Sequence, residues 1–233
     1  MNIEGIDVDI RVRNNKRMRS LKIGTDKRRM QVYASVPSWV EMDYVETLLK
    51  ENIDTLREMQ EEIDQSKKEI DFSSMYLFGK KYAIKHKDGK TKIGEINNNT
   101  IILYGDMMES AERLGRSIFK KELPRMMDEC VQVTGRAPKE FRIKRMKTKW
   151  GTCNVVHERI WINLVLVQMP EEIIKEVITH ELTHLYVRNH GSEFKKLMDD
   201  FYPGWDKIEK ANMEYKKYGG IIRLCSMNTP RIR

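Results

Sequence analysis

The sequence of residues 180–190 is His180-Glu181-Leu182-Thr183-His184-Leu185-Tyr186-Val187-Arg188-Asn189-His190, which holds three of the protein's five histidines. On an α-helix, His180 and His184 lie one turn apart on the same face, so both rings can bind one metal ion. Glu181 lies beside them, where a glutamate deprotonates metal-bound water. Three neutral imidazoles with one open position indicate a catalytic zinc site, because a structural site usually has a fourth protein ligand.

His190 cannot return to the metal along a straight helix, because six residues turn through about 600° and rise roughly 9 Å. The sequence therefore predicts a helix break near residue 189. Asn189 can adopt a left-handed conformation, Gly191 can stop the helix and Ser192 can cap the next one. Glu193 is an alternative third ligand, although its place in the first turn of that helix favours helix stabilisation.

The composition is that of a soluble globular protein. At 233 residues, with 40% hydrophobic and 33% charged residues, the chain can form one large domain or two small ones around a core. It has no apolar run of about 18 residues and no signal-like start, which predicts a cytoplasmic protein without membrane contact. The three cysteines are odd in number, widely spaced and outside any CxxC pair, which supports neither a disulfide framework nor a Cys-rich zinc module.

Residues 1–105 are predicted to form a β-rich N-terminal region with an amphipathic helix. The hydrophobic pattern indicates a small antiparallel sheet within residues 6–36 and a helix over about 38–69. A three-stranded meander is predicted for the strands 76–85, 91–96 and 100–104.

Residues 106–218 are predicted to form the catalytic core, followed by a basic tail over 219–233. The expected elements are a helix over 106–133 ending at Gly135, strands 141–146 and 159–166, the metal helix from Pro170, and helices over 193–202 and 204–217.

Four blocks in this core resemble the YgjP-like metallopeptidase family, which is related to SprT-like zinc proteases. The blocks are Trp150-Gly151-Thr152-Cys153, Arg159-Ile160-Trp161-Ile162-Asn163, His180-Glu181-Leu182-Thr183-His184 and Asn189-His190-Gly191-Ser192-Glu193-Phe194. The resemblance is specific over residues 140–205. It implies an α+β, zincin-like fold in which a small sheet packs on the metal helix, with His180, His184 and His190 binding Zn²⁺ and Glu181 acting as general base. It also implies peptide or protein substrates.

The chain departs from the metzincins, which have the same histidine spacing. Val187 stands where those enzymes have a helix-ending glycine, and no clear Met-turn follows. By resemblance to zincins, the strand 159–166 is expected to be the sheet edge on which an extended substrate pairs.

Several other residues are candidates for the site. Trp150 is expected to pack near it, and Asn163 is expected either to cap a local turn or to donate to substrate. The anion formed in peptide hydrolysis needs a donor besides the metal, for which Tyr186, Arg188 and Tyr202 are candidates. Cys153 and His157 suggest a thiol protease, but no orienting Asn or Asp accompanies them.

The net charge of +8 and the basic run Arg142, Lys144, Arg145, Lys147 and Lys149 leave two interpretations open. One is a solvated face of a basic enzyme, and the other is a surface that contacts nucleic acid. Peptide hydrolysis is the first functional hypothesis. The alternatives are hydrolysis of a non-peptide bond, such as a nucleotide phosphoanhydride, and a nucleic-acid-associated protein with a structural metal site, which the presence of Glu181 disfavours.

Overall fold

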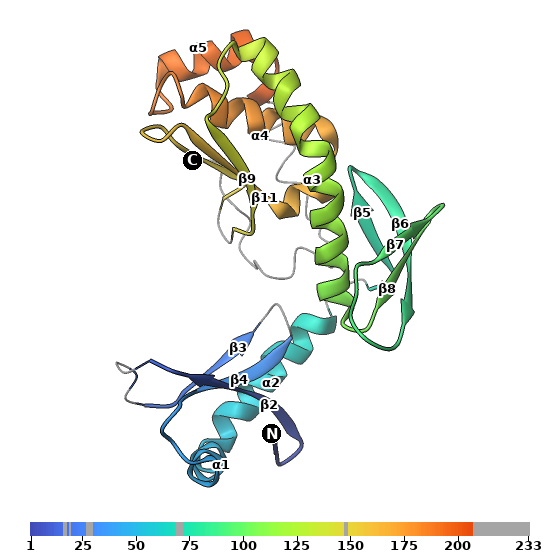
Figure 1. Cartoon of the computed structure of the whole chain (residues 1–233), viewed down its shortest axis with the longest axis vertical. Helices are drawn as coiled ribbons and strands as arrows, with labels where there is room; N and C mark the ends of the chain where they lie inside the picture. The colour runs from blue at the N-terminus through green and yellow to red at the C-terminus, as the bar shows by residue number, and fades with distance from the viewer. Residues whose placement is uncertain (16–17, 19, 27–29, 69–71, 147–148, 207–233) are drawn as a thin grey trace. The chain divides into compact units, whose positions relative to one another are not determined.

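The structure is a computed structural model and describes residues 1–15, 18, 20–26, 30–68, 72–146 and 149–206 (Figure 1). The chain forms two compact units, Met1–Ile70 and Asp71–Arg233. Helices and small sheets occur in both, so the fold is a mixture of α and β elements. The basic tail and most of the helix expected over 204–217 lie outside the described residues.

The first unit contains a four-stranded sheet with the order β1-β2-β4-β3. Its strands are β1 (Asn2–Ile3), β2 (Ile6–Arg13), β3 (Lys22–Asp26) and β4 (Gln31–Pro37). Strand β4 is antiparallel to β3 but parallel to β2. The expectation of an antiparallel sheet was therefore wrong for this pair. The reason is that β3 lies at the outer edge, so β4 returns beside β2 in the same direction.

Two helices follow the sheet, where the sequence pattern predicted one. Helix α1 spans Met42–Glu51 and α2 spans Ile53–Lys68, with Asn52 between them. The Asn52 side chain donates a hydrogen bond to the Leu48 carbonyl at 2.7 Å, and such bonds compete with the helical backbone. The predicted apolar face is confirmed by the buried side chains Val45, Leu49, Leu56 and Ile63.

The second unit begins with another four-stranded sheet, ordered β5-β6-β8-β7. The strands are β5 (Ser74–Leu77), β6 (Lys80–Lys87), β7 (Glu95–Asn97) and β8 (Thr100–Tyr104). The predicted three-stranded meander was wrong in two ways. Phe78 and Gly79 adopt positive φ angles of 48° and 77°, which divide the first expected strand into a hairpin. Strands β6 and β8 are parallel.

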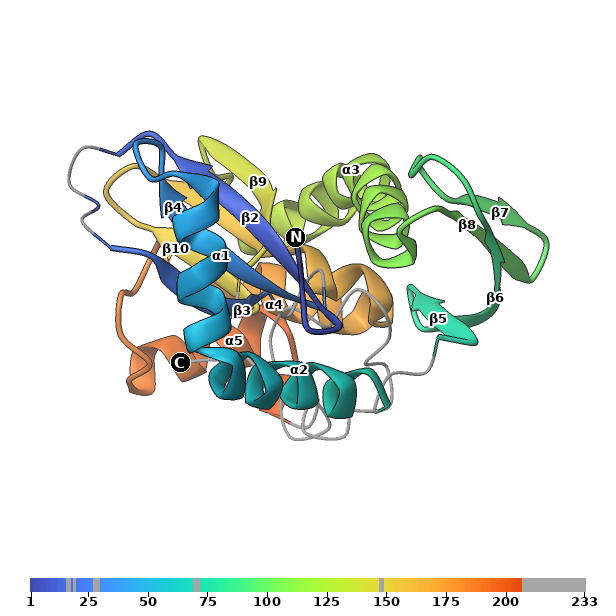
Figure 2. The same cartoon turned by 90° about the horizontal axis from the view of Figure 1, so that it is seen from below.

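Residues 71–105 therefore belong with the later part of the chain, which differs from the sequence-based division after residue 105. The turn of the β5–β6 hairpin is bound to η1 (Leu164–Gln168), because the Phe78 amide donates to the Val167 carbonyl at 2.8 Å. Helix α3 (Met107–Thr134) lies between this sheet and α4 (Glu171–Thr183), as Figure 2 shows. The sheet thus shares one core with the metal helix.

Helix α3 begins and ends as its sequence predicts. The Asp106 side chain accepts a hydrogen bond from the Glu109 amide at 2.9 Å, and Gly135 closes the helix in the left-handed conformation with φ 73°. Pro124 lies inside the helix. The buried side chains of helix α3 belong to the same core as those of α4.

A three-stranded sheet beside α4 has the order β10-β11-β9, from β9 (Glu140–Lys144), β10 (Gly151–Asn154) and β11 (Arg159–Asn163). The expected strand 159–166 ends at Asn163, whose side-chain oxygen accepts from the Val165 amide and starts η1. Strand β11 is central, so the prediction that it forms the substrate edge was wrong. The edge next to α4 is β10.

The basic run does not share one face. Arg142 and Lys144 are exposed two positions apart on β9, whereas Arg145 turns inward and pairs with Glu112 at 2.6 Å. Lys147 lies outside the described residues. Among the described helices, none combines the length and apolar character needed to cross a membrane.

Candidate metal centre

Helix α4 carries His180 and Glu181 through the protein interior. Pro170 precedes the helix with extended backbone, and two acids occupy its first turn, where negative charge is favourable. Its apolar side chains Ile173, Ile174, Val177, Ile178 and Leu182 are at most 3% exposed. His180 is 3% exposed and Glu181 is 6% exposed. The two polar groups are therefore held rigidly by the surrounding core.

The chain turns back sooner than predicted. Helix α4 ends at Thr183, and the next amides bond three residues back, from Leu185 to the Leu182 carbonyl at 2.9 Å and from Tyr186 to the Thr183 carbonyl at 3.0 Å. Such bonds tighten a helix end. The predicted break near residue 189 was wrong, and neither Asn189 nor Gly191 has a positive φ.

Position 187 does not require a helix-ending glycine, because helix α4 has already ended at Thr183. Helix α5 (Ser192–Phe201) follows, with Gly191 at its N-cap position and Ser192 as its first residue. Ser192 was predicted to be the N-cap, but Gly191 holds that position and Ser192 is the first residue inside the helix. The short segment between the helices returns His190 to the metal helix.

The three histidines converge. Ligand nitrogens of His180, His184 and His190 all lie within 4.8 Å of one another, and the Nε2 atoms of His180 and His190 are 2.9 Å apart. His184 Nδ1 lies 3.1 Å from the Val187 carbonyl, which can only accept. His184 therefore donates from Nδ1 and presents an unprotonated Nε2, the arrangement that orients metal-binding histidines.

Burial keeps two of these rings neutral. It lowers the pKa of His184 despite the opposing hydrogen bond to Val187, and it lowers the pKa of His190. Neutral imidazole is the form that binds a metal ion. In a tetrahedral zinc site, the Zn–N length places the ligand nitrogens about 3.3 Å apart, and here one pair is 2.9 Å apart while all three lie within 4.8 Å of one another. The residues present therefore fit a divalent metal ion.

Phe194 supports all three imidazoles. Its ring is 1% exposed, and its centroid lies 4.9 Å from those of His180 and His184 and 4.6 Å from that of His190. Sequence reasoning placed Phe194 in a family block without assigning it this role. The signal was an apolar residue four positions after the last histidine, at the start of an amphipathic helix.

Glu181 lies in close contact with the edge strand. A Cβ atom built on Gly151 would lie 2.6 Å from both Cγ and Oε1 of Glu181. Burial raises the pKa of Glu181 to about 8; nearby Lys149 opposes this shift and Glu176 adds to it. A glutamate with a raised pKa is a stronger base than one in water.

A model of the YgjP-like metallopeptidase domain matches residues 19–213, most of the chain. The chain belongs to the YgjP-like family. The family is one of metallopeptidases, and the histidine cluster agrees with a metal-dependent enzyme. A search of curated proteins finds no match.

Two solved structures with local similarity are metallopeptidase zymogens. Abylysin of Pyrococcus abyssi is 19% identical with a TM-score of 0.38, and the match covers 42% of this chain and 98% of abylysin. Jannalysin of Methanocaldococcus jannaschii is 19% identical with a TM-score of 0.36, and the match covers 41% of this chain and 88% of jannalysin.

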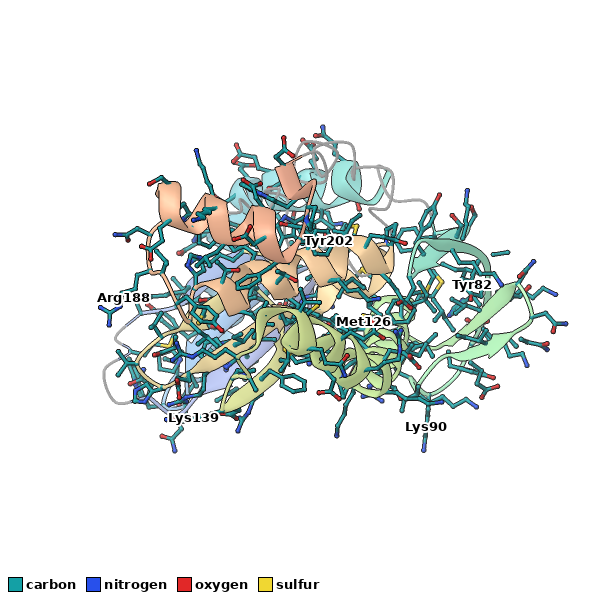
Figure 3. The ribbon with its side chains drawn as sticks, turned by 90° about the horizontal axis from the view of Figure 1, so that it is seen from above. Tyr82, Lys90, Met126, Lys139, Arg188 and Tyr202 are labelled. Carbon is teal, nitrogen blue, oxygen red and sulfur yellow. The ribbon has the colours of Figure 1, made fainter. Side chains whose placement is uncertain are left out.

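The pocket beside the histidines brings several predicted residues together. Trp150, Cys153, Glu181 and Arg188 line it with the three histidines. Trp150 is 4% exposed and belongs to the core, whereas Arg188 is exposed and extends outward from the loop after α4 (Figure 3). Sequence reasoning missed Lys149 and Gly151 as site residues, although both lie in or beside the Trp150 block.

Asn163 organises the loop before the pocket. Its Nδ2 donates to the carbonyls of Met146 at 2.9 Å and Lys149 at 2.7 Å, which uses both amide hydrogens. The side chain is buried and is not among the pocket-lining residues. Of the two roles expected for Asn163, the structure shows the capping role, through its bonds to Met146, Lys149 and Val165.

Two candidate donors are engaged elsewhere. The Tyr186 hydroxyl donates to the Thr134 carbonyl at 2.7 Å, and the Tyr202 hydroxyl donates to the Glu172 carbonyl at 2.8 Å. Glu193 is exposed in the first turn of α5 and is not part of the histidine cluster. Arg188 and Lys149 are the cations that line the pocket.

The thiol-protease alternative has no support. Burial raises the pKa of Cys153 to about 12, and Glu181 adds to the shift. A nucleophilic cysteine needs a lowered pKa. His157 is exposed in the turn after β10, where its amide donates to the Asn154 side chain. At neutral pH, Cys153 is therefore a protonated thiol.

Gly151→Ala is expected to reduce kcat/KM by about 100-fold, because a displaced catalytic group of this kind costs that much. The added methyl group would collide with the Glu181 side chain, whereas the histidines would keep their places. Steady-state kinetics and metal analysis would measure both effects. Gly191→Ala is the matched control, since a Cβ there meets nothing within 4 Å. Full activity of Gly151→Ala would contradict the close contact.

Proposed function

We propose that this chain is a zinc-dependent peptidase of the HExxH type with a zincin-like core. The observation that carries the proposal is the convergence of three imidazoles beside a buried glutamate, next to β10, an edge strand of the sheet that the described residues form. His180, His184 and His190 would hold the zinc ion. When bound, zinc would polarise the scissile carbonyl and lower the pKa of a water molecule.

Glu181 is the proton-transfer group in this proposal. The ionised carboxylate accepts a proton from the attacking water and later delivers it to the leaving amine. Its buried position beside the three histidines suits both steps, because the same carboxyl group must accept a proton first and release it afterwards. Gly151 leaves room for the carboxylate between β10 and α4.

Strand β10 provides a surface for an extended substrate. The Asn163 amide donates to the Trp150 carbonyl at 2.8 Å, so hydrogen-bonded pairs with β11 alternate from that position. The main-chain groups of Gly151 and Cys153 therefore point away from β11, towards the side on which the described residues add no further strand. A peptide added there would be bound through its backbone, which gives little sequence preference.

The anion of the transition state would be stabilised by a cation at the pocket. Arg188 and Lys149 both line it, and Lys149 is near enough to favour the charged form of Glu181. The Lys149 backbone is anchored by Asn163, whereas Arg188 lies on an exposed loop. Lys149 is therefore the better preorganised of the two for this role.

The first test is metal analysis of the purified protein followed by a peptide-library assay. We expect about one zinc ion per chain, as the three-ligand site predicts, and peptide cleavage that a chelator abolishes and added zinc restores. Nucleoside triphosphates should be assayed alongside, because a metal-activated water also attacks phosphorus. Turnover of triphosphates without peptide cleavage would replace the peptidase proposal with the phosphoanhydride alternative. A protein that binds no metal when zinc is supplied would refute both.

A further inference from the structure

Arg136 lies outside the pocket but binds two segments that form it. It follows Gly135, the residue that ends α3. Its Nη1 donates to the Leu185 carbonyl at 2.5 Å, and its Nη2 donates to Glu158 Oε1 at 2.7 Å. The guanidinium also lies over the Tyr186 ring, 5.5 Å from the centroid. One side chain therefore joins three parts of the chain.

The first arm of this guanidinium holds the turn that carries the metal-binding histidines. Leu185 directly follows His184, and the Val187 carbonyl two residues later accepts from His184 Nδ1. Tyr186 anchors the same turn through its hydroxyl bond to Thr134. The orientation of the His184 ring thus depends on a turn that the end of α3 holds in place.

The second arm holds the hairpin of the edge strand. Glu158 lies in the turn between β10 and β11 with a positive φ of 49°. Its other oxygen pairs with Lys139 Nζ at 2.9 Å, and its carbonyl accepts from the Lys139 amide at 2.8 Å. Hydrogen bonds from Lys139 and Arg136 lower the pKa of Glu158, so the carboxylate is charged at neutral pH.

We propose that Arg136 is a positioning residue that fixes the β10 edge relative to the metal-binding histidines. The inference rests on the proposed metal site and edge strand. Peptide hydrolysis requires the scissile carbonyl, bound on β10, to reach the metal with an error well below 1 Å. A planar guanidinium suits this task because its donors point in fixed directions, whereas a lysine ammonium cannot bridge two acceptors in the same geometry.

The two arms can be separated by substitution. Arg136→Gln removes both, and Arg136→Lys restores the charge without the fork. Glu158→Asn removes the hairpin arm together with the Lys139 ion pair and keeps the Leu185 arm, and asparagine tolerates the positive φ at this position. Arg125→Gln is the matched control, because Arg125 similarly joins Glu129 on α3 to Glu171 on α4 without contacting the turn or the hairpin.

The measurements are zinc affinity by competition with a chelator, the visible spectrum of the cobalt-substituted protein, kcat and KM separately, and thermal unfolding. Arg136→Gln is expected to weaken zinc binding by about 10- to 100-fold, the usual cost of losing a group that orients a ligand, and to change the cobalt spectrum. Arg136→Lys should recover part of the affinity. Glu158→Asn should keep zinc affinity and the spectrum but raise KM for peptides.

Unchanged zinc affinity and an unchanged cobalt spectrum in folded Arg136→Gln would overturn the inference. So would an Arg125→Gln variant with the same losses, because the effect would then reflect general stability. If the wild-type protein binds zinc and Arg136→Gln binds it as tightly as Arg125→Gln does, only the role of Arg136 is refuted. A wild-type protein without zinc refutes the proposed function and the inference with it.

Discussion

Glu181→Gln is expected to lower kcat by about 10²- to 10⁴-fold, the usual contribution of a general base, while zinc remains bound. Glutamine has nearly the same shape, so it keeps the contact with Gly151 and leaves the three histidines unaltered. It cannot accept the proton from water. The loss should therefore appear in kcat with little change in KM, because substrate pairing on β10 does not involve this carboxylate.

Metal analysis and steady-state kinetics on the same preparation would test this expectation. Glu193→Gln is the control, since Glu193 is an exposed glutamate of the neighbouring helix and stands outside the histidine cluster. It should retain both zinc and turnover. Full activity of Glu181→Gln on a genuine substrate would show that another group takes the proton. Loss of zinc from Glu193→Gln would instead make that residue a ligand.

His184→Ala is expected to abolish both metal binding and turnover. Two imidazoles would remain, one fewer than a catalytic zinc site uses. The variant also removes the hydrogen bond to Val187 and part of the packing against Phe194. Zinc content should fall from about one ion per chain to a trace, and added zinc should not restore activity.

His157→Ala is the matched control for this substitution. His157 is an exposed histidine of the same unit and is absent from the cluster, so its removal should change neither zinc content nor kcat/KM. If His184→Ala kept about one zinc ion and measurable turnover, the convergence of the three histidines would not define the metal site. A loss of zinc in both variants would point to nonspecific binding by surface histidines.

Rules based on short sequence patterns were reliable for helix ends and for the buried faces of helices. Helix α3 begins within one residue of its predicted start and has the predicted stop at Gly135, because both ends depend on hydrogen bonds within a few residues. Helix α5 starts within one residue of its expected position. The apolar periodicity also identified the buried faces of α1, α2 and α4 correctly.

The order and direction of the strands could not be predicted from short sequence patterns. The parallel pairs β2–β4 and β6–β8 join strands separated by an edge strand, and alternation along a strand carries no information about its neighbours. The central position of β11 was missed for this reason. The division of the chain also depended on tertiary contacts, since the β5–β8 sheet binds η1 and α3 through segments distant in sequence.

The candidate site shows the same contrast. The spacing of His180, Glu181 and His184 specifies their relation on a helix, because 3.6 residues per turn leave only one arrangement. The return of His190 was expected, but its route was not, since a tight turn at residues 184–187 replaces the left-handed residue. The contact of the Phe194 ring with the histidines depends on the packing of α5 against α4.

Residue identity and short spacing thus predicted the family and the three histidines that converge, and they led to the proposal of Glu181 as general base. Tertiary structure alone decided that β10 is an edge strand of its sheet, that Gly151 admits Glu181, and that Arg136 joins the hairpin to the histidine turn. These contacts connect residues far apart in sequence. Their geometry depends on how the whole core packs, and that free energy is shared among many side chains rather than encoded in any short stretch.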